Sequence, residues 1–349
     1  MKNVIVKVIC VMQCAIGYSE TIRFKALVID SESQKPIKGA KVAGWFHNSP
    51  RSWWGTGETE MDYAYTDSNG FCSLSGSSDR KDVSAAVWSA DGYYTIESIP
   101  NCIPKGSVKI PCNQSSKSIL GGLFAVKPVV TMQVDKVRSP IPLKVKVAEL
   151  PFGKTFKAKP LPLCAPISYD LMIGDWLPPY GEGRVSDIDF IMNRTSLGQE
   201  PYEYPSGIKT NEFYRYDVKA KFVGLKNGVI EKITTNKPGV KLRIAPDDGY
   251  TFEYVCWRGR ISRTEYKNNY DPNRCFYFRI RTETNENGKV QKAYYGKIYG
   301  DFKLCQTDEG ITDIAFLYYL NPTPNDRNLE WDMKNNLCPV QKRISNPQP

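Results

Sequence analysis

Pairs of carboxylates are the first candidates for chemistry in this chain of 349 residues. Asp187 and Asp189 lie two residues apart in a segment with strand character, and Glu58, Glu60 and Asp62 form a second acidic cluster. Residues i and i+2 of a strand share a face, and glycosidases use two carboxylates roughly 5 to 9.5 Å apart. Solvated strand faces offer the same spacing. The alternative function is therefore a glycan hydrolase that uses paired carboxylates of the second domain.

The sequence gives little support for nucleophilic catalysis, a zinc site or a phosphate-binding loop. His47 is the only histidine, and its use as a base for a nucleophile would need a G-x-S-x-G type segment, which the chain lacks. Zinc sites use cysteine and histidine at short spacing, and no C-x-x-C pair is present. The GEG segment at residues 181–183 reads as a turn without the helix that would bind phosphate. We predict no catalytic residue, no metal and no cofactor.

The most specific binding feature is a long aromatic segment, WFHNSPRSWWGTGETEMDYAY at residues 45–65. Long loops at the end of a rigid sandwich commonly carry function. Two adjacent tryptophans offer flat faces to sugar rings, and the polar side chains around them offer hydrogen bonds to hydroxyls. The predicted ligand-binding residues are Arg51, Trp53, Trp54, Glu58, Glu60 and Asp62. Because a tryptophan also commonly packs back on the core, both interpretations stay open.

Short strand and turn signals surround this loop and must position it. The segment ALVIDSESQKPIKGAKV gives a strand, a turn at Pro36 and a second strand from Gly39; TDSNG gives a turn at residues 66–70, and DGYY starts a strand at Asp91. This spacing is typical of a small antiparallel sandwich. On KPIKGAKV, TDSNG and DGYY, residues 20–112 resemble the carboxypeptidase regulatory-like domain. The resemblance implies a transthyretin-like sandwich of seven antiparallel strands, common on exported bacterial proteins.

The resemblance also raises the possibility of a zinc peptidase, which can be tested by counting residues. Metallocarboxypeptidases bind zinc through two histidines and a glutamate. Because His47 is the only histidine, the chain does not carry that catalytic unit. The resemblance therefore bears on the fold and implies no activity.

The N-terminus has the character of an export signal. Lys2 gives a positive start, an apolar run follows, and Ala15 and Gly17 place small residues before a cut. We predict a signal peptide at residues 1–17, with a first β-strand as the alternative; the bulky residues before Cys14 disfavour a lipid anchor there. No later run approaches the roughly 20 apolar residues that cross a bilayer. We expect a secreted, periplasmic or cell-surface protein whose mature chain has no membrane span.

The cysteines that remain after removal of this signal are even in number, which favours disulfides in an exported chain. Local spacing is the only guide to their pairing, and buried free thiols are the alternative. The predicted pairs are Cys102 with Cys112, Cys256 with Cys275, Cys305 with Cys338, and Cys72 with Cys164.

Positive charge is concentrated in residues 113–165, a proline-rich segment with nine lysines and arginines against two acidic residues. Such a segment could contact an anionic envelope polymer. The alternative is a solvated connecting segment whose lysines keep a strand edge from pairing. A nucleic-acid partner would need a recognisable module with base-stacking residues. None is evident, so no nucleic acid is expected.

The remainder, residues 166–345, again shows strand and turn signals, including a hairpin turn at Asn227-Gly228. The predicted strands include residues 184–192, 212–223, 229–234, 275–282 and 312–321. At residues 297–304, Ile298 and Phe302 alternate with Lys297 and Asp301, which predicts a strand with one buried and one solvated face. Three segments resemble parts of secreted bacterial proteins and imply a real domain but no activity: YDLMIGDWLPPYGEGRVSDIDF, YGKIYGDFKL and YYLNPTPNDRNLEWD.

The expected architecture is all-β. A seven-stranded antiparallel sandwich at residues 20–112 is followed by the basic segment at 113–165 and by a second antiparallel β-domain at 166–345. With 41% hydrophobic and 12% aromatic residues, the chain can bury a core that offsets its conformational entropy. The expected function is that of an exported, non-enzymatic protein that binds a glycan or another surface polymer, or that has a structural role in the envelope.

Overall fold

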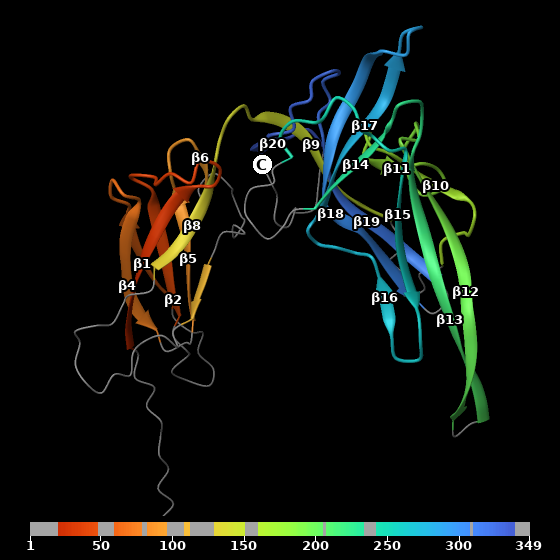
Figure 1. Cartoon of the computed structure of the whole chain (residues 1–349), viewed down its shortest axis with the longest axis horizontal. Helices are drawn as coiled ribbons and strands as arrows, with labels where there is room; N and C mark the ends of the chain where they lie inside the picture. The colour runs from red at the N-terminus through yellow and green to blue at the C-terminus, as the bar shows by residue number, and fades with distance from the viewer. Residues whose placement is uncertain are drawn as a thin grey trace, which may run out of the picture. The chain divides into compact units, whose positions relative to one another are not determined.

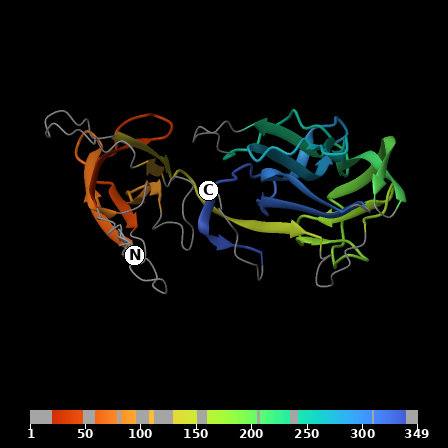
Figure 2. The same cartoon turned by 90° about the horizontal axis from the view of Figure 1, so that it is seen from below.

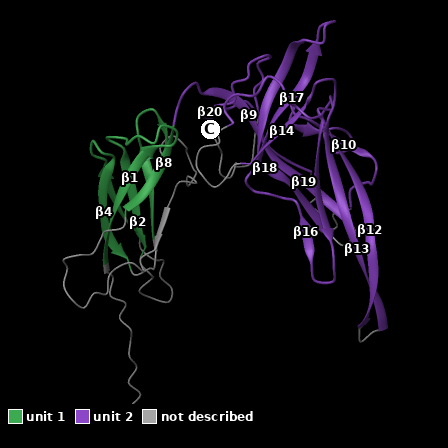
Figure 3. Cartoon of the chain, in the orientation of Figure 1, with its two compact units in different colours: residues 1–97, 103–135 green, residues 98–102, 136–349 purple. Residues whose placement is uncertain are grey.

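The computed structural model describes residues 20–47, 59–78, 82–95, 108–111, 129–150, 160–204, 207–233, 242–307 and 310–338. All regular secondary structure in these residues is β-strand, and within them no helix is long and apolar enough to cross a membrane. The chain divides into two compact units, residues 1–97 with 103–135 and residues 98–102 with 136–349 (Figure 3). The predicted all-β class is confirmed. The predicted signal peptide at 1–17 lies outside the described residues.

The first unit is built from two four-stranded sheets, coloured red to yellow in Figures 1 and 2. One sheet has the order β4–β1–β8–β6, with β1 (Glu20–Asp30), β4 (Phe71–Ser78), β6 (Tyr93–Tyr94) and β8 (Val129–Lys136). The other has the order β3–β2–β5–β7, with β2 (Lys41–His47), β3 (Thr59–Tyr65), β5 (Asp82–Ser89) and β7 (Val108–Pro111). Alternate side chains of both sheets, among them Phe24, Val42 and Leu74, form the buried core.

The TDSNG segment forms the turn that its sequence predicts. Asp67 Oδ1 accepts the N–H groups of Asn69 and Phe71 at 2.8 and 2.9 Å. Gly70 has a φ of +77°, and a Cβ at this position would lie 2.7 Å from the carbonyl oxygen of Val28. Only glycine meets both conditions without strain. The turn therefore fixes how β4 enters the sheet beside β1.

The second unit contains two six-stranded sheets. One has the order β11–β10–β12–β13–β15–β16, with β10 (Pro166–Asp170), β11 (Asp175–Trp176), β12 (Ile188–Tyr204), β13 (Gly207–Phe222), β15 (Glu253–Arg260) and β16 (Tyr266–Asn268). The other has the order β14–β17–β18–β19–β9–β20, with β9 (Ile141–Glu149), β14 (Gly228–Ile233), β17 (Arg274–Thr284), β18 (Val290–Thr307), β19 (Gly310–Leu320) and β20 (Trp331–Asn336). Both sheets contribute to one core, in which the rings of Trp176, Phe190, Phe302 and Phe316 touch in sequence.

The predicted connecting segment, residues 113–165, contributes a strand to each unit. β8 lies parallel to β1, so the prediction of seven antiparallel strands is wrong for the first sandwich. It has two sheets of four strands and extends past its predicted end at residue 112. β9 pairs with β19 on one side and β20 on the other. Lys144 and Lys146 therefore belong to an interior strand, and the expectation that lysines here protect a strand edge is wrong for β9.

The strand at residues 297–304 is largely buried on both faces as far as Phe302, in contrast to the prediction of one solvated face, whereas Lys303 is exposed. Ile298 and Phe302 point into the main core, but Lys297 and Asp301 are buried as well. A second apolar cluster explains this, because Leu242, Ala245 and Leu329 cover the outer face of the same sheet. Residues 242–245 and 329 come from segments without regular structure, which period-two patterns do not reveal.

A long ribbon, which we call the arm, extends from β12 and β13 (green in Figure 1). These strands pair with each other over almost their whole length, but β10 pairs with β12 only as far as Ile191, and β15 pairs with β13 only from Tyr214. Beyond these points the side chains are mostly exposed, including Leu197 and Ile208. The described part of the arm is residues 193–204 and 207–213, and it lies outside both hydrophobic cores of the second unit.

Candidate functional site

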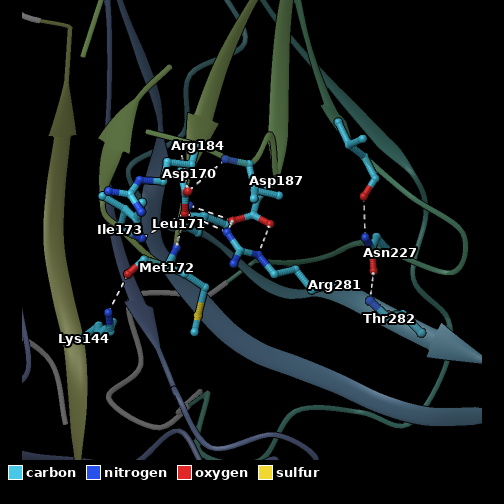
Figure 4. Close-up of polar contacts among 12 residues, drawn as sticks. Lys144, Asp170, Leu171, Met172, Ile173, Arg184, Asp187, Asn227, Arg281 and Thr282 are labelled. Carbon is cyan, nitrogen blue, oxygen red and sulfur yellow. Dashed lines mark hydrogen bonds and ion pairs between the residues drawn. The ribbon is translucent and has the colours of Figure 1, made fainter. Parts of the chain in front are cut away.

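Two acidic residues of the second unit, Asp170 and Asp187, form a buried ion cluster with Arg281 (Figure 4). Asp170 ends β10, Asp187 immediately precedes β12, and Arg281 lies in the irregular part of β17. The Arg281 Nη2 atom is 2.7 Å from Asp170 Oδ1, and its Nε atom is 2.9 Å from Asp187 Oδ1. Both carboxylates are buried. One guanidinium thus joins a strand of one sheet to residues of the other.

Backbone N–H groups occupy the remaining acceptor positions of these carboxylates. Asp170 accepts the N–H groups of four residues, and Asp187 accepts that of Leu171 at 2.9 Å. The four donors to Asp170 are Met172, Ile173, Arg184 and Val185. Burial raises the pKa of Asp187, while Arg281 opposes that shift. The cluster therefore holds loop backbone and two sheets together, and its oxygens are already engaged.

The position of Arg281 depends on a neighbouring asparagine. Arg281 has a φ of +50°, in the left-handed region that costs energy for a residue with a side chain. Asn227 holds the next residue in place, because its Oδ1 atom accepts the N–H of Thr282 at 2.9 Å and its amide nitrogen donates to the Val223 carbonyl. Figure 4 shows these contacts beside the cluster. The bulge is thereby fixed with the guanidinium aimed at the two aspartates.

Asp189 has partners of its own, so the suggested pair of Asp187 and Asp189 is not assembled. Its Oδ1 atom accepts the hydroxyls of Ser168 and Ser186 at 2.6 and 2.5 Å. The predicted strand begins at Arg184, but β12 begins at Ile188, so Asp187 lies outside the pleat that was expected to align the two carboxylates. These residues provide structural contacts and no facing pair of carboxylates for hydrolysis.

In the first unit, Glu60 and Asp62 close the edge of the sandwich. Both lie on β3, and their carboxylates accept the N–H groups of Ser77 and Ser75 on β4, each at 2.8 Å. β3 and β4 are outer strands of their two sheets, so these bonds satisfy edge donors that would otherwise be open to another strand. This role differs from the predicted ligand binding. The other predicted site residues lie outside the described residues: Arg51, Trp53, Trp54 and Glu58.

The opposite side of the same sheet carries an exposed aromatic surface that the sequence analysis did not identify. Tyr63 on β3 and Trp88 on β5 meet edge to face with ring centroids 5.6 Å apart. The Lys41 ammonium on β2 lies 4.4 Å from the centroid of the Tyr63 ring and 5.9 Å from that of Trp88. Tyr63 is 39% exposed, although it lies in the middle of a strand. Aromatic rings exposed in this way are typical of binding surfaces.

Neighbouring outward positions extend this surface along the sheet. Met61 and Tyr65 follow the same alternation on β3 and are 41% and 67% exposed, and half-buried Trp45 on β2 pairs with Met61. Ala43 and Ala86 form a small-residue floor between the rings, because Ala43 pairs with both Tyr63 and Ala86. We call this surface the aromatic face; it comprises Lys41, Trp45, Met61, Tyr63, Tyr65 and Trp88.

The cysteines that the structure describes do not form the predicted disulfides. Cys72, Cys164, Cys256, Cys305 and Cys338 are free thiols. Cys256 points into the core between the sheets of the second unit, whereas Cys275 belongs to the cluster on the outer face of the other sheet. Sequence spacing cannot reveal that two strands direct their cysteines to different clusters. Cys102 and Cys112 lie outside the described residues.

His47 Nδ1 lies 3.0 Å from the Thr59 hydroxyl at the end of β2. Within the described part of the chain, no group of three or more histidine, cysteine, aspartate or glutamate side chains could hold a metal ion.

Comparisons with known proteins give no family. No family model matches the chain, and no curated protein matches it. Among solved structures, the crystal structure of BcpA, the major pilin subunit of Bacillus cereus, aligns with 85% of this chain and 95% of that chain at 12% identity. The TM-score of that alignment is 0.20, a value on which we base no argument. The resemblance of residues 20–112 to the carboxypeptidase regulatory-like domain stays a prediction.

Proposed function

We propose that this protein is an exported, non-enzymatic β-protein that binds a glycan on the aromatic face of its first sandwich. The secreted, periplasmic or cell-surface location belongs to the same proposal and derives from the N-terminal sequence. The observation that carries it is the pair of Tyr63 and Trp88, whose rings meet on the outer side of a sheet beside Lys41. A structural role in the envelope is compatible with glycan binding at this surface.

Sugars suit such a surface for a physical reason. A pyranose has an apolar face of C–H groups, which packs on an aromatic ring, and a rim of hydroxyls, which bond to tyrosine hydroxyls and water. Because the two rings are nearly perpendicular, a sugar would stack on the face of one ring and touch the edge of the other above the small-residue floor. The carboxylates that suggested a hydrolase, Asp187 and Asp189, bind Arg281, serine hydroxyls and a backbone N–H group, which favours the non-enzymatic proposal over the hydrolase alternative.

The test is glycan-array binding by the full mature protein, with aromatic substitutions as variants. We expect Tyr63→Ala and Trp88→Ala each to weaken binding of the glycans recognised by the wild type by up to about tenfold, since a ring contact contributes about 0.5–1.5 kcal/mol. Phe71→Ala is the matched control, because Phe71 is similarly exposed but lies on β4 in the other sheet. It should leave binding unchanged.

Two results would contradict the proposal. One is an array on which the wild-type protein binds nothing above background. The other is glycan binding that Tyr63→Ala and Trp88→Ala leave intact, with thermal denaturation showing that both variants are folded.

A further inference from the structure

The aromatic face carries one well-placed positive charge. Lys41 Nζ lies above the Tyr63 ring and within 5.9 Å of the Trp88 ring centroid, so the two rings restrict where the ammonium can go. The ammonium keeps donors available, because contact with a ring face occupies only one side of the group. An acceptor on a ligand that stacks on these rings would therefore lie beside it.

The described side chains around Lys41 favour a negative ligand. The outward neighbours closest to Lys41 on β3 and β5 are Tyr63, Tyr65, Ala86 and Trp88, none of which is acidic. The two nearest carboxylates on β3, Glu60 and Asp62, alternate to the other side of the sheet and accept N–H groups of β4. Their charge is thus directed toward the sandwich edge and away from the aromatic face.

We infer that the aromatic face binds an acidic polysaccharide, with an aromatic ring stacked on a uronic acid unit and the Lys41 ammonium paired with its carboxylate. This inference rests on the proposed glycan binding and adds the class of sugar. An ammonium held beside stacking rings can form a charge-assisted hydrogen bond to the carboxylate of a sugar stacked on those rings. A neutral sugar lacks this bond, so the surface would prefer a carboxylated sugar.

A matched pair of polymers tests the charge separately from the stacking. Polygalacturonate and its fully methyl-esterified form share one backbone and differ in the carboxylate. We expect the full-length wild-type protein to bind polygalacturonate about two- to fivefold more tightly in calorimetry, the range expected for an exposed ion pair. This preference should shrink as salt is raised from about 20 to 500 mM.

Lys41→Met is the decisive variant, because methionine keeps the apolar stem on the rings and removes the charge. The preference for polygalacturonate should disappear in this variant, while binding to the methyl ester stays unchanged. Tyr63→Ala should weaken binding to both polymers. Lys38→Met is the control, since Lys38 is exposed in the turn before β2 and lies outside the aromatic face; it should keep the wild-type preference.

The outcomes separate this inference from the proposed function. Equal binding of both polymers by the wild type, or an unchanged preference in Lys41→Met, would overturn the acidic-sugar inference and leave glycan binding standing. Absence of binding to either polymer would overturn the inference, and a blank glycan array would overturn both. Poly-glutamate is the third probe: binding as tight as that of polygalacturonate would show charge attraction without sugar recognition, and would also overturn the inference.

Discussion

Arg281 is the residue on which the buried Asp170 and Asp187 depend. Asp170 and Asp187 are both inaccessible to solvent, and the guanidinium contacts each of them. Removing one partner of a buried ion pair leaves an uncompensated charge and typically costs about 3–5 kcal/mol. The cluster therefore matters to stability mainly because removing one partner would leave a buried charge unpaired. The net attraction between the partners contributes less.

Replacing Arg281 with methionine should lower the free energy of unfolding of the second unit by about 3–5 kcal/mol. Adding Asp187→Asn to this variant should recover part of the lost stability, because the amide removes one of the two buried carboxylates that have lost their cationic partner. Urea unfolding followed by tryptophan fluorescence measures both effects. Arg215→Met is the control, since Arg215 pairs with Asp217 on the partly exposed surface of β13. Equal losses for Arg281→Met and Arg215→Met would refute the role given to the cluster.

Asp30 gives the first sandwich a defined dependence on pH. Burial would raise the pKa of Asp30, but N–H donation by Ser33 and Glu32 outweighs burial, and the pKa lies below its ordinary value. A lowered pKa in the folded state stabilises the protein above the unfolded-state pKa of about 3.9. That stability is lost as the pH falls through the folded-state pKa.

Asp30→Asn should accordingly reduce the fall in stability between about pH 5 and pH 2. The wild type should be the more stable protein at neutral pH, and the difference should narrow on acidification. Urea midpoints measured across this range provide the comparison. The control is Asp91→Asn, at an exposed position in the turn before Tyr93, which should follow the wild-type curve. Parallel curves for Asp30→Asn and the wild type would count against this assignment.

At the scale of elements, a strand could be predicted where a local sequence pattern sets its bounds. The β13, β14, β17 and β19 strands lie within a few residues of their predicted ranges, because polar turns such as Asn227-Gly228 end them. The sequence could not show to which unit β8 and β9 belong, because both strands lie in the same basic, proline-rich segment. Their places are set by pairing with β1 and β19, which are distant in the sequence.

The candidate site shows the same division between local and distant information. The alternation of Met61, Tyr63 and Tyr65 on β3 is visible in the sequence, and it could have indicated an exposed aromatic stripe. Trp88 joins that stripe only because β2 lies between β3 and β5. The ion cluster is still harder to foresee, because Arg281 and Asp187 are separated by 94 positions and by a bulge that no propensity encodes.

The arm offers a test at this scale. Replacing residues 197–212 by a two-residue Asn-Gly turn should change the melting temperature by only a few degrees, because the removed side chains are mostly exposed and surface changes cost little. Removing Ile208, which is 76% exposed, should also reduce aggregation on heating. Calorimetry and light scattering measure the two effects. A collapse in melting temperature would show that the arm supports the core.

At the scale of the whole molecule, the cysteines report on both units at once. Cys72 is buried in the first sandwich and Cys256 in the core of the second, whereas Cys164 and Cys305 are exposed. Burial raises the pKa of Cys72 to about 11 and that of Cys256 well above its ordinary value. The thiolate is the reactive form. Both buried thiols are therefore protected from modification, because a reagent cannot reach them and because they stay protonated.

In reduced, folded protein at about pH 8, an alkylating reagent should modify Cys164 and Cys305 at least about tenfold faster than Cys72 and Cys256. Peptide mapping by mass spectrometry assigns each site, and the same reaction in denaturant should remove the difference. Both buried thiols should become reactive only as their own unit unfolds, so mapping along a urea titration would report the stability of the two units separately. Rapid modification of Cys256 in native conditions would contradict its place in the core. A Cys256–Cys275 peptide from unreduced protein would do so as well, because the two side chains belong to different clusters.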